Sequence, residues 1–472
     1  MKKPSILLTI SAIVLVLGLT SCYWVFDSGL GSLQLDLSAL SAKGPGVPSA
    51  RIYLIANNLL HPLGDGVDYV QVGYNQVTEI TLEDIPVGPT YRVAVSMGYT
   101  EPGWFDTHYW AESADFEIFP GAKTAVVFDT DDFDFSEDPF NPVQYDPENM
   151  MDKKLIDVEV YGSSVYAADS AKLYELPNYA PYSPLGIIET NAPGGQSINS
   201  VSIAADDWAS FALCANTNRD IYSYFGYPSS FFNSIATTDT LEPVSILDSS
   251  AGTFSSDRLI FFRGADSWGG TFAPGETSAF DWKWAIQSSD RVTDMVVSND
   301  ADANAYFATA GGAFRVKGDY LYEVSTGGSP NLNAYKTGFN APSPIISLEL
   351  VEVGFTALVV NLVMGTENGV WEATLASDPD VINQPTQRDG TQGFRIRQIA
   401  ASNYTNPYFI AYLSDAYLFV WNDLDKELYR FPIAAGLPGR ITGMAWFDTG
   451  SAYCLLVSGE NGLAFKEFNY PV

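Results

Sequence analysis

Residues 455–465 read LLVSGENGLAF, two apolar runs joined by the dipeptide Asn461-Gly462. An Asn-Gly pair supplies the two residues of positive φ that a tight two-residue hairpin requires, and glycine adopts that conformation without steric cost. The sequence therefore predicts an antiparallel pair of β-strands here. Two further stretches repeat the arrangement, YFATAGGAFRV at 306–316 and LVMGTENGVW at 362–371.

A shorter apolar motif precedes each of these hairpins and recurs along the chain. It consists of an apolar residue, two further residues and a second apolar residue, usually with a third apolar residue two positions later. Its first residues lie 43, 46, 48, 53, 51 and 45 positions apart. Self-similarity at such a period indicates a repeat architecture. The motif begins at Leu155, Ile198, Val244, Val292, Ile345, Ile396 and Ile441.

Seven units of this length, each with room for three or four strands, predict a β-propeller over residues 153–472. Seven blades are favoured, although the weak motif at Val244 leaves six or eight open. The last unit has room for only three strands, so we expect the segment before Leu155 to supply a fourth and close the ring. The array resembles extracytoplasmic propellers that repeat a strand, a glycine turn and a strand in each blade. It lacks the WD dipeptide and the Asp-box pattern.

Residues 31–128 predict a small β-sandwich, because about seven short alternating runs are separated by turn signals. The fold class is therefore all-β throughout. Within this region the stretch LEDIPVGPTYRVAV at 82–95 resembles a hairpin of transthyretin-like and carboxypeptidase-regulatory-like domains. In that resemblance Pro86 and Gly88 form the corner and Tyr91 starts the next core strand. The resemblance implies a spacer or adhesion module and no chemistry.

Residues 129–152 are acidic and carry three prolines, which predicts a linker. Its aspartates could bind Ca²⁺, because hard cations prefer several carboxylate oxygens. The glycine and the closing glutamate of an EF-hand are missing, so we favour a solvated linker with no cofactor. The candidate calcium ligands are Asp129, Asp131, Asp132 and Asp134.

The amino-terminal residues 1–21 have a basic start and an apolar run of about 14 residues, typical of a secretory signal. The run is shorter than the roughly 20 residues of a membrane span, which is the alternative interpretation. Leu19-Thr20-Ser21-Cys22 resembles the bacterial lipobox. That resemblance implies cleavage before Cys22, a lipid on its thiol and a mature lipoprotein whose residues 22–30 form a tether. Tyr23, in place of aspartate, favours sorting to the outer membrane.

The formal net charge is −32, and removal of Lys2 and Lys3 with the signal leaves 22 basic and 56 acidic groups, or −34. This balance opposes binding to nucleic acid. Cys214 and Cys454 each lie in an apolar strand-like run, in units separated by a whole unit, so we expect buried free thiols.

The chain has two histidines, His61 and His108, both in the sandwich, where we expect surface or packing roles. Histidine-dependent catalysis and histidine metal sites are therefore excluded from the propeller. Paired carboxylates could still support a carbohydrate-active hydrolase or lyase, but no constellation indicates one.

The segment 265–290 is rich in aromatic residues. Its tryptophans would grip a sugar or peptide if exposed on a loop, or would cover the core if they lie on one strand face. The candidates are Trp268, Trp282 and Trp284.

These features favour a lipid-anchored envelope protein whose propeller is a binding platform for a protein or glycan partner. Its contact with the membrane is through the lipid. One alternative is an envelope-assembly factor, since a propeller lipoprotein of the outer-membrane barrel-insertion machinery has similar parts. That family has eight blades, a recurring tryptophan signature and no amino-terminal sandwich. The other alternative is a carbohydrate-active enzyme.

Overall fold

A computed structural model describes the chain in two compact units. Unit 1 contains Met1–Thr100 and Phe105–Pro139, and unit 2 contains Glu101–Trp104 and Phe140–Val472. For residues 202–285 only the strand backbone is described. The described residues are 29–38, 49–63, 67–73, 79–101, 104–127, 136, 138–143, 153–177, 187–192, 196–205, 211–217, 220–225, 231–237, 253–254, 258–263, 268–272, 282–285, 292–297, 305–309, 312–316, 337–339, 343–353, 359–375, 384–402 and 407–470.

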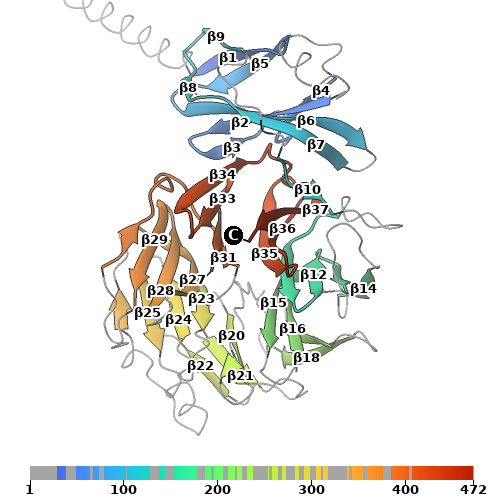
Figure 1. Cartoon of the computed structure of the whole chain (residues 1–472), viewed down its shortest axis with the longest axis vertical. Coiled ribbons are helices and arrows are strands. Elements are labelled where there is room, and N and C mark those ends of the chain that lie inside the picture. Colours follow the sequence, from blue (N-terminus) through green and yellow to red (C-terminus); the bar gives the residue numbers. More distant parts are fainter. Residues whose placement is uncertain are drawn as a thin grey trace, which may run out of the picture. The chain divides into compact units, whose positions relative to one another are not determined.

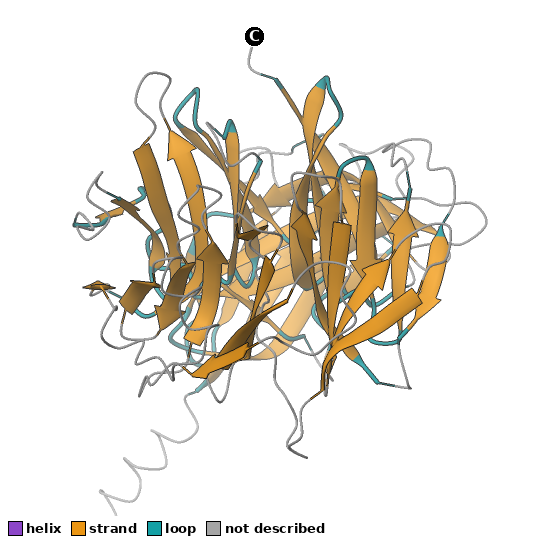
Figure 2. Ribbon diagram, turned by 90° about the horizontal axis from the view of Figure 1, so that it is seen from below, coloured by secondary structure: helices purple, strands orange, loops and turns teal. Residues whose placement is uncertain are grey.

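Every regular element among these residues is a β-strand (Figure 2), which confirms the predicted all-β class. The described part of the chain therefore contains no helix that could cross a membrane.

Unit 1 consists of two sheets. One has the strand order β5-β1-β9, with β1 antiparallel to β5 and parallel to β9. The other has the order β3-β2-β6-β7, with β4 also paired to β2 and β8 to β6. The strands are β1 (Leu30–Asp36), β2 (Ser49–Ala56), β3 (Leu59–His61), β4 (Val70–Val72), β5 (Glu79–Pro86), β6 (Thr90–Glu101), β7 (Trp104–Glu112), β8 (Phe116–Glu117) and β9 (Lys123–Val127).

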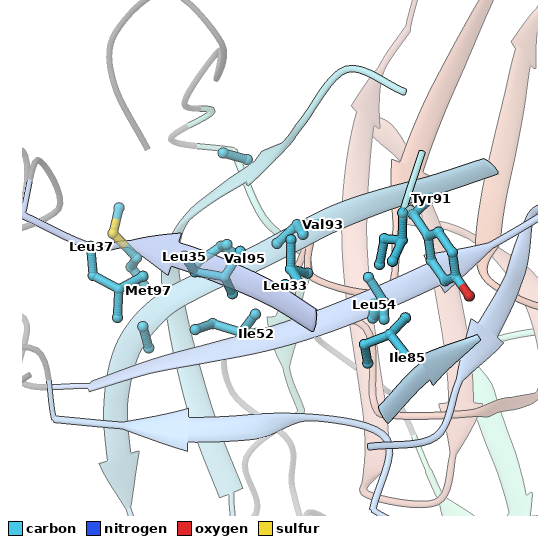
Figure 3. Close-up of a cluster of buried hydrophobic side chains, with 13 residues drawn as sticks. Leu33, Leu35, Leu37, Ile52, Leu54, Ile85, Tyr91, Val93, Val95 and Met97 are labelled. Carbon is cyan, nitrogen blue, oxygen red and sulfur yellow. The ribbon is translucent and has the colours of Figure 1, made fainter. Parts of the chain in front are cut away.

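The core of unit 1 follows from the alternation of apolar residues along these strands. Leu33, Leu35 and Leu37 of the β1 region meet apolar residues of β2 and β6 such as Ile52 and Val95 (Figure 3), and all are buried. Because successive side chains of a strand point to opposite faces, this alternation brings one face of each sheet to a shared core.

The predicted corner at residues 86–91 is confirmed. Gly88 has a φ of +112°, a conformation that side chains rarely adopt. The hydroxyl of Tyr91 donates a 2.6 Å hydrogen bond back to the carbonyl oxygen of Pro86. Tyr91 is fully buried, so this bond satisfies a polar group that would otherwise be costly in the core.

Unit 2 is built of small antiparallel sheets, seven of which have four strands each among the described residues. In six of them the four strands follow one another in the chain. That the complete ring has seven blades stays a prediction.

The strands of the seven sheets, with semicolons between sheets, are β11 (Asp157–Tyr161), β12 (Ser164–Ala168), β13 (Lys172–Leu176), β14 (Ile188–Asn191); β15 (Ile198–Ala205), β16 (Phe211–Thr217), β17 (Asp220–Phe225), β18 (Phe231–Thr237); β19 (Thr253–Phe254), β20 (Arg258–Arg263), β21 (Trp268–Phe272), β22 (Trp282–Ala285); β23 (Val292–Val297), β24 (Ala305–Thr309), β25 (Gly312–Val316), β26 (Thr337–Phe339); β27 (Ile345–Val353), β28 (Val359–Thr366), β29 (Gly369–Thr374), β30 (Thr386–Gln387); β31 (Gln398–Ala401), β32 (Phe409–Leu413), β33 (Tyr417–Asn422), β34 (Glu427–Pro432); and β10 (Asn141–Pro142), β37 (Gly462–Asn469), β36 (Ala452–Gly459), β35 (Ile441–Asp448).

The sheets follow one another around a centre, with β15, β23, β27, β31 and β35 innermost in their sheets (Figure 1). Contacts run in series from β23 to β27, β31, β35, β11 and β15. These six strands begin at or within the predicted apolar motifs, which confirms the propeller arrangement for this part of the unit. The motif at Val244 lies outside the described residues.

The ring is closed by a strand from before the first motif, as the sequence predicts. In β10, Asn141 pairs with Phe465 and Pro142 with Ala464 of β37, so the last sheet contains the two ends of the unit. The strand lies inside the stretch 129–152 that the sequence predicts as a linker. Residues 140–143 are thus part of a sheet, and Phe140 and Val143 are buried.

The innermost strands share a bulge that the sequence did not predict. In four sheets the pairing with the second strand shifts between the first and third residues of the motif, at Ile198/Ser200, Val292/Asp294, Ile345/Ser347 and Ile441/Gly443. A bulge re-aims the side chain of the extra residue. The second residue of the motif is therefore free to contact a neighbouring sheet.

Candidate functional site

The three tryptophans predicted to bind a partner lie on strands. Trp268 begins β21, and Trp282 and Trp284 lie on β22, the last strand of its sheet. In the backbone register Trp268 pairs with Ala285 and Trp284 with Gly269. The placement favours the strand alternative over an exposed loop, while a role in binding stays a prediction.

The predicted lipidation site Cys22 and the aspartates at 129, 131, 132 and 134 lie outside the described residues. Within the described part of the chain, no group of three or more His, Cys, Asp or Glu side chains could hold a metal ion.

Cys454 is a buried free thiol, as predicted, and burial raises the pKa of its sulfhydryl. Cys214 lies on β16, in a different sheet. In unit 1, His61 packs edge-on against Tyr91, and burial lowers the pKa of its imidazole. His108 lies 3.2 Å from the Asp106 carboxylate and packs edge-on against Tyr99. These histidines have packing and surface contacts, as expected.

Carboxylates of the innermost strands bind the backbone of the next sheet. Asp157 accepts a 2.9 Å hydrogen bond from the Val201 amide, and Asp294 accepts a 2.7 Å bond from the Leu348 amide. Each aspartate is the third residue of its motif, and each amide belongs to the fourth residue of the next. The repeated register shows that these contacts align neighbouring sheets.

The bulged second residue of the motif makes a companion contact. Thr293 Oγ1 donates to the carbonyl oxygen of Ile345, and Thr442 Oγ1 donates to that of Leu155, both at 2.9 Å. Arg397 takes the same position and donates from Nη2 to the Ile441 carbonyl oxygen at 3.2 Å. In each pair the acceptor is the first residue of the next motif, so the sheets are joined at the end where the innermost strands begin.

A partly buried glutamate makes a similar contact between β27 and β31. The Glu349 carboxylate accepts hydrogen bonds from the amides of Leu350 and Ala401. Burial raises the pKa of this carboxyl group to about 7, although the two amide bonds oppose the shift.

Basic residues gather at the end of unit 2 where the innermost strands begin. Lys154, Arg395 and Arg440 each directly precede the first residue of a motif, and Arg397 is the second residue of one. We call these four residues the basic rim. They come from three consecutive sheets, because β31, β35 and β11 follow one another around the ring.

Two rim residues pair with glutamates in the hairpin turns of the preceding sheet. Lys154 Nζ lies 3.0 Å from Glu460, in the β36–β37 turn, and Arg395 Nε lies 3.2 Å from Glu367, in the β28–β29 turn. The hairpins lie where the Asn-Gly dipeptides predict them, but the prediction that both residues of the pair have positive φ is wrong. Only Gly369 and Gly462 have positive φ, and the two residues of each turn are Glu367-Asn368 and Glu460-Asn461. Rigid hairpins thus hold acidic side chains against the rim.

Asp415 in the β32–β33 turn joins two of the arginines. It lies 3.0 Å from Arg397 Nε and 3.7 Å from Arg395 Nη1. Burial lowers the pKa of the Arg397 guanidinium, opposed by Asp415 and aided by the charges of Arg440 and Arg395.

Arg440 differs from its neighbours because its side chain is exposed and forms no ion pair with any described residue. The other three basic groups of the rim pair with the acids Glu367, Asp415 and Glu460. The rim therefore has one exposed guanidinium, that of Arg440, available to a carboxylate ligand.

The sequence contains a periodic signal for the rim. A basic residue stands directly before four of the seven motifs, at Lys154, Arg291, Arg395 and Arg440. These basic residues are recognised by their repeated position before the motif, because they do not form a run of charges in the sequence.

No protein-family model and no curated protein sequence matches this chain. Among solved structures, the chain is similar to Chaetomium thermophilum Raptor at 13% identity and a TM-score of 0.49, over 71% of this chain and 29% of that one. The chain is also similar to the RRP9 WD40 repeats, at 13% identity and a TM-score of 0.46, over 70% of this chain and 97% of that one. A third similar structure is PorZ, a surface component of the type-IX secretion system of Porphyromonas gingivalis. The identity is 14% and the TM-score 0.45, over 71% of this chain and 39% of that one. Likeness at this level concerns the fold alone.

Proposed function

We propose that this chain is a lipid-anchored protein of the cell envelope whose propeller binds a protein partner at the basic rim. The anchor is Cys22, the outer membrane is its site, and the sandwich is a spacer. The signal-like residues 1–21 and the lipobox-like quartet that ends at Cys22 support the anchor.

Lipidation of Cys22 predicts a fatty-acid labelling result. Cells that express the full chain should incorporate a labelled fatty acid into it, and Cys22→Ser should abolish this labelling, because the acyl chain has no other attachment point in the proposal. The measurement is in-gel detection of the label after growth with an alkyne fatty acid. Equal labelling of the Cys22→Ser variant would refute lipidation at this residue.

The exposed guanidinium of Arg440, beside the paired Arg395 and Arg397, carries the proposed binding face. Exposed ion pairs contribute little to stability, on the order of 0–1 kcal/mol. An exposed arginine without an acidic partner contributes still less. Binding is thus a better account of Arg440 than folding, since loops held on a rigid scaffold are frequent binding sites.

The charge of the chain defines the chemistry of the partner. An overall charge of −32 repels acidic proteins at long range. The rim nevertheless offers the exposed guanidinium of Arg440, which can bind a carboxylate through paired hydrogen bonds. We infer that the partner presents an acidic segment to the rim.

The test is a pull-down of the intact lipoprotein from crosslinked envelopes. We expect wild type to recover a specific protein, and Arg395→Ser/Arg440→Ser to lose most of it with an unchanged melting temperature. Lys426→Ser is the matched control, because Lys426 is an exposed lysine paired with Asp423 in the β33–β34 turn, at the other end of the sheet. A Trp282→Ala/Trp284→Ala variant tests the tryptophans in the same experiment. Undiminished recovery by the rim variant would refute the rim as the binding face.

A further inference from the structure

A group of tyrosines lies at the opposite end of the last two sheets from the rim. Tyr408 directly precedes β32, Tyr453 is the second residue of β36, and Tyr470 follows β37. Strand β36 runs from this end to the rim turn at Gly459, so its length separates the two surfaces. We call Tyr408, Tyr453 and Tyr470, with Asp448 of the β35–β36 turn, the tyrosine patch.

The rings of the patch contact one another. Tyr453 and Tyr470 meet edge to face, with centroids 5.0 Å apart, and Tyr408 lies 5.9 Å from Tyr453 at an angle of 43°. Side chains with only two rotatable bonds lose little entropy when they are fixed in this way. The patch is therefore ordered before any ligand arrives.

Buried aromatic rings support the patch from below. Trp446 stacks on Phe409 at 5.8 Å and contacts Phe468 at 5.6 Å. The indole Nε1 of Trp446 donates a 2.9 Å hydrogen bond to the carbonyl oxygen of Ala400 in the neighbouring sheet. Phe409 packs against Tyr453 with centroids 6.1 Å apart, and Phe468 pairs with Tyr453 in the backbone register, so the patch rests on a rigid base.

The outer surface of the patch combines aromatic rings with acceptors. Tyr408 is 39% exposed and Tyr470 is partly exposed, whereas Tyr453 between them is buried. Asp448, Gly450 and Ser451 of the adjacent turn are exposed, and Thr449 is partly exposed. Aromatic faces beside a few polar groups are typical of small-ligand sites.

One carboxylate oxygen of Asp448 accepts hydrogen bonds within the patch, and the other can accept a bond from a ligand. Its Oδ1 accepts hydrogen bonds from the Tyr470 hydroxyl and, at 2.7 Å, from the Gly450 amide. Oδ2 has no hydrogen bond to a described residue. The bond to Asp448 raises the pKa of Tyr470 to about 12.

We propose that the tyrosine patch binds a neutral polysaccharide. The faces of aromatic rings are negative and attract the C–H faces of pyranose rings, while Asp448 Oδ2 can accept a bond from a sugar hydroxyl. The acidic side chain and the net charge of −32 disfavour anionic glycans. This site is independent of the protein-binding function proposed for the rim.

The test is affinity gel electrophoresis of the mature chain through gels that contain laminarin, hydroxyethylcellulose, galactomannan, xyloglucan or dextran, with alginate as the anionic comparison. We expect at least one neutral polysaccharide to retard the wild type, alginate to have no effect, and Tyr408→Ala to weaken binding at least tenfold. Asp448→Asn, which keeps the shape of the side chain, should weaken binding about threefold or more.

Tyr429→Ala is the matched control, because Tyr429 is a partly exposed tyrosine of β34 outside the patch. It should bind as wild type does, and melting temperatures should show that all variants are folded. The proposal is overturned if no neutral polysaccharide retards the wild type, if alginate alone does, or if Tyr408→Ala and Tyr429→Ala are retarded equally.

Discussion

Replacing Phe140 with alanine should lower the free energy of unfolding of unit 2 by about 3–5 kcal/mol, the usual loss for a buried phenylalanine. Phe140 directly precedes the closing strand β10 and is 1% exposed. Its ring packs edge-on against Phe431 at 5.4 Å, and the Lys466 ammonium lies 5.9 Å from its centroid. The side chain thus fixes the closing strand to the last two sheets. We expect a fall of about 10 °C in the melting temperature by calorimetry.

The backbone around Phe140 explains why its neighbours cannot compensate. Its amide donates a 2.7 Å hydrogen bond to the Ala435 carbonyl oxygen. Gly436 has a φ of +83°, and a Cβ there would lie 2.4 Å from the Phe140 carbonyl oxygen. The control is Phe119→Ala in unit 1, which is 58% exposed and should change stability by less than about 0.5 kcal/mol. Equal effects of the two substitutions would show that closure by β10 does not stabilise the ring.

Asp157→Ala should destabilise unit 2 by about 2–4 kcal/mol, because it leaves two buried amides without acceptors. Asp157 is 7% exposed and accepts 2.9 Å bonds from the amides of Val158 and Val201. The substitution also removes the contact that aligns β11 with β15. Gly443 leaves room for this carboxylate, since a Cβ there would lie 2.6 Å from Asp157 Oδ1.

The matched control is Asp389→Ala, because Asp389 is an exposed aspartate of the β30–β31 connection whose carboxylate accepts a 3.3 Å bond from Gln392. Urea unfolding followed by circular dichroism should show the loss for Asp157→Ala and almost none for Asp389→Ala. A loss below about 0.5 kcal/mol at Asp157 would contradict a structural role for the contacts between innermost strands.

Much of the fold can be predicted because it depends on residues that are adjacent in the sequence. The Asn-Gly dipeptides predict the positions of the hairpins at Gly369 and Gly462, although only the glycine of each pair has positive φ. The shortage of one strand in the last repeat predicts the closing strand, which the pairing of Asn141 with Phe465 confirms. The corner before Tyr91 is likewise set by adjacent residues.

The contacts between sheets were not predictable in the same way. The partners of Asp294 and Thr442 lie in other repeats, and the bond from Thr442 to Leu155 spans 287 residues. The bulge that four innermost strands share positions these side chains, and the sequence of any one repeat does not predict that bulge. The basic rim was missed for a related reason, because Lys154, Arg395 and Arg440 are isolated in sequence and meet only when consecutive sheets are arranged in a ring.

Site-specific photocrosslinking tests the proposed binding face most directly. A photoreactive amino acid replaces Asn461 in one variant and Leu424 in another. Asn461 is exposed in the β36–β37 turn, where the neighbouring Glu460 amide bonds to the Arg440 carbonyl oxygen, so all four basic side chains of the rim stay in place. Leu424 is 56% exposed in the β33–β34 turn at the other end of the sheet. Illumination of intact cells followed by immunoblotting should give a discrete adduct from position 461 and none from position 424. An adduct from position 424 alone, or none from position 461, would contradict the basic rim as the surface that binds the partner.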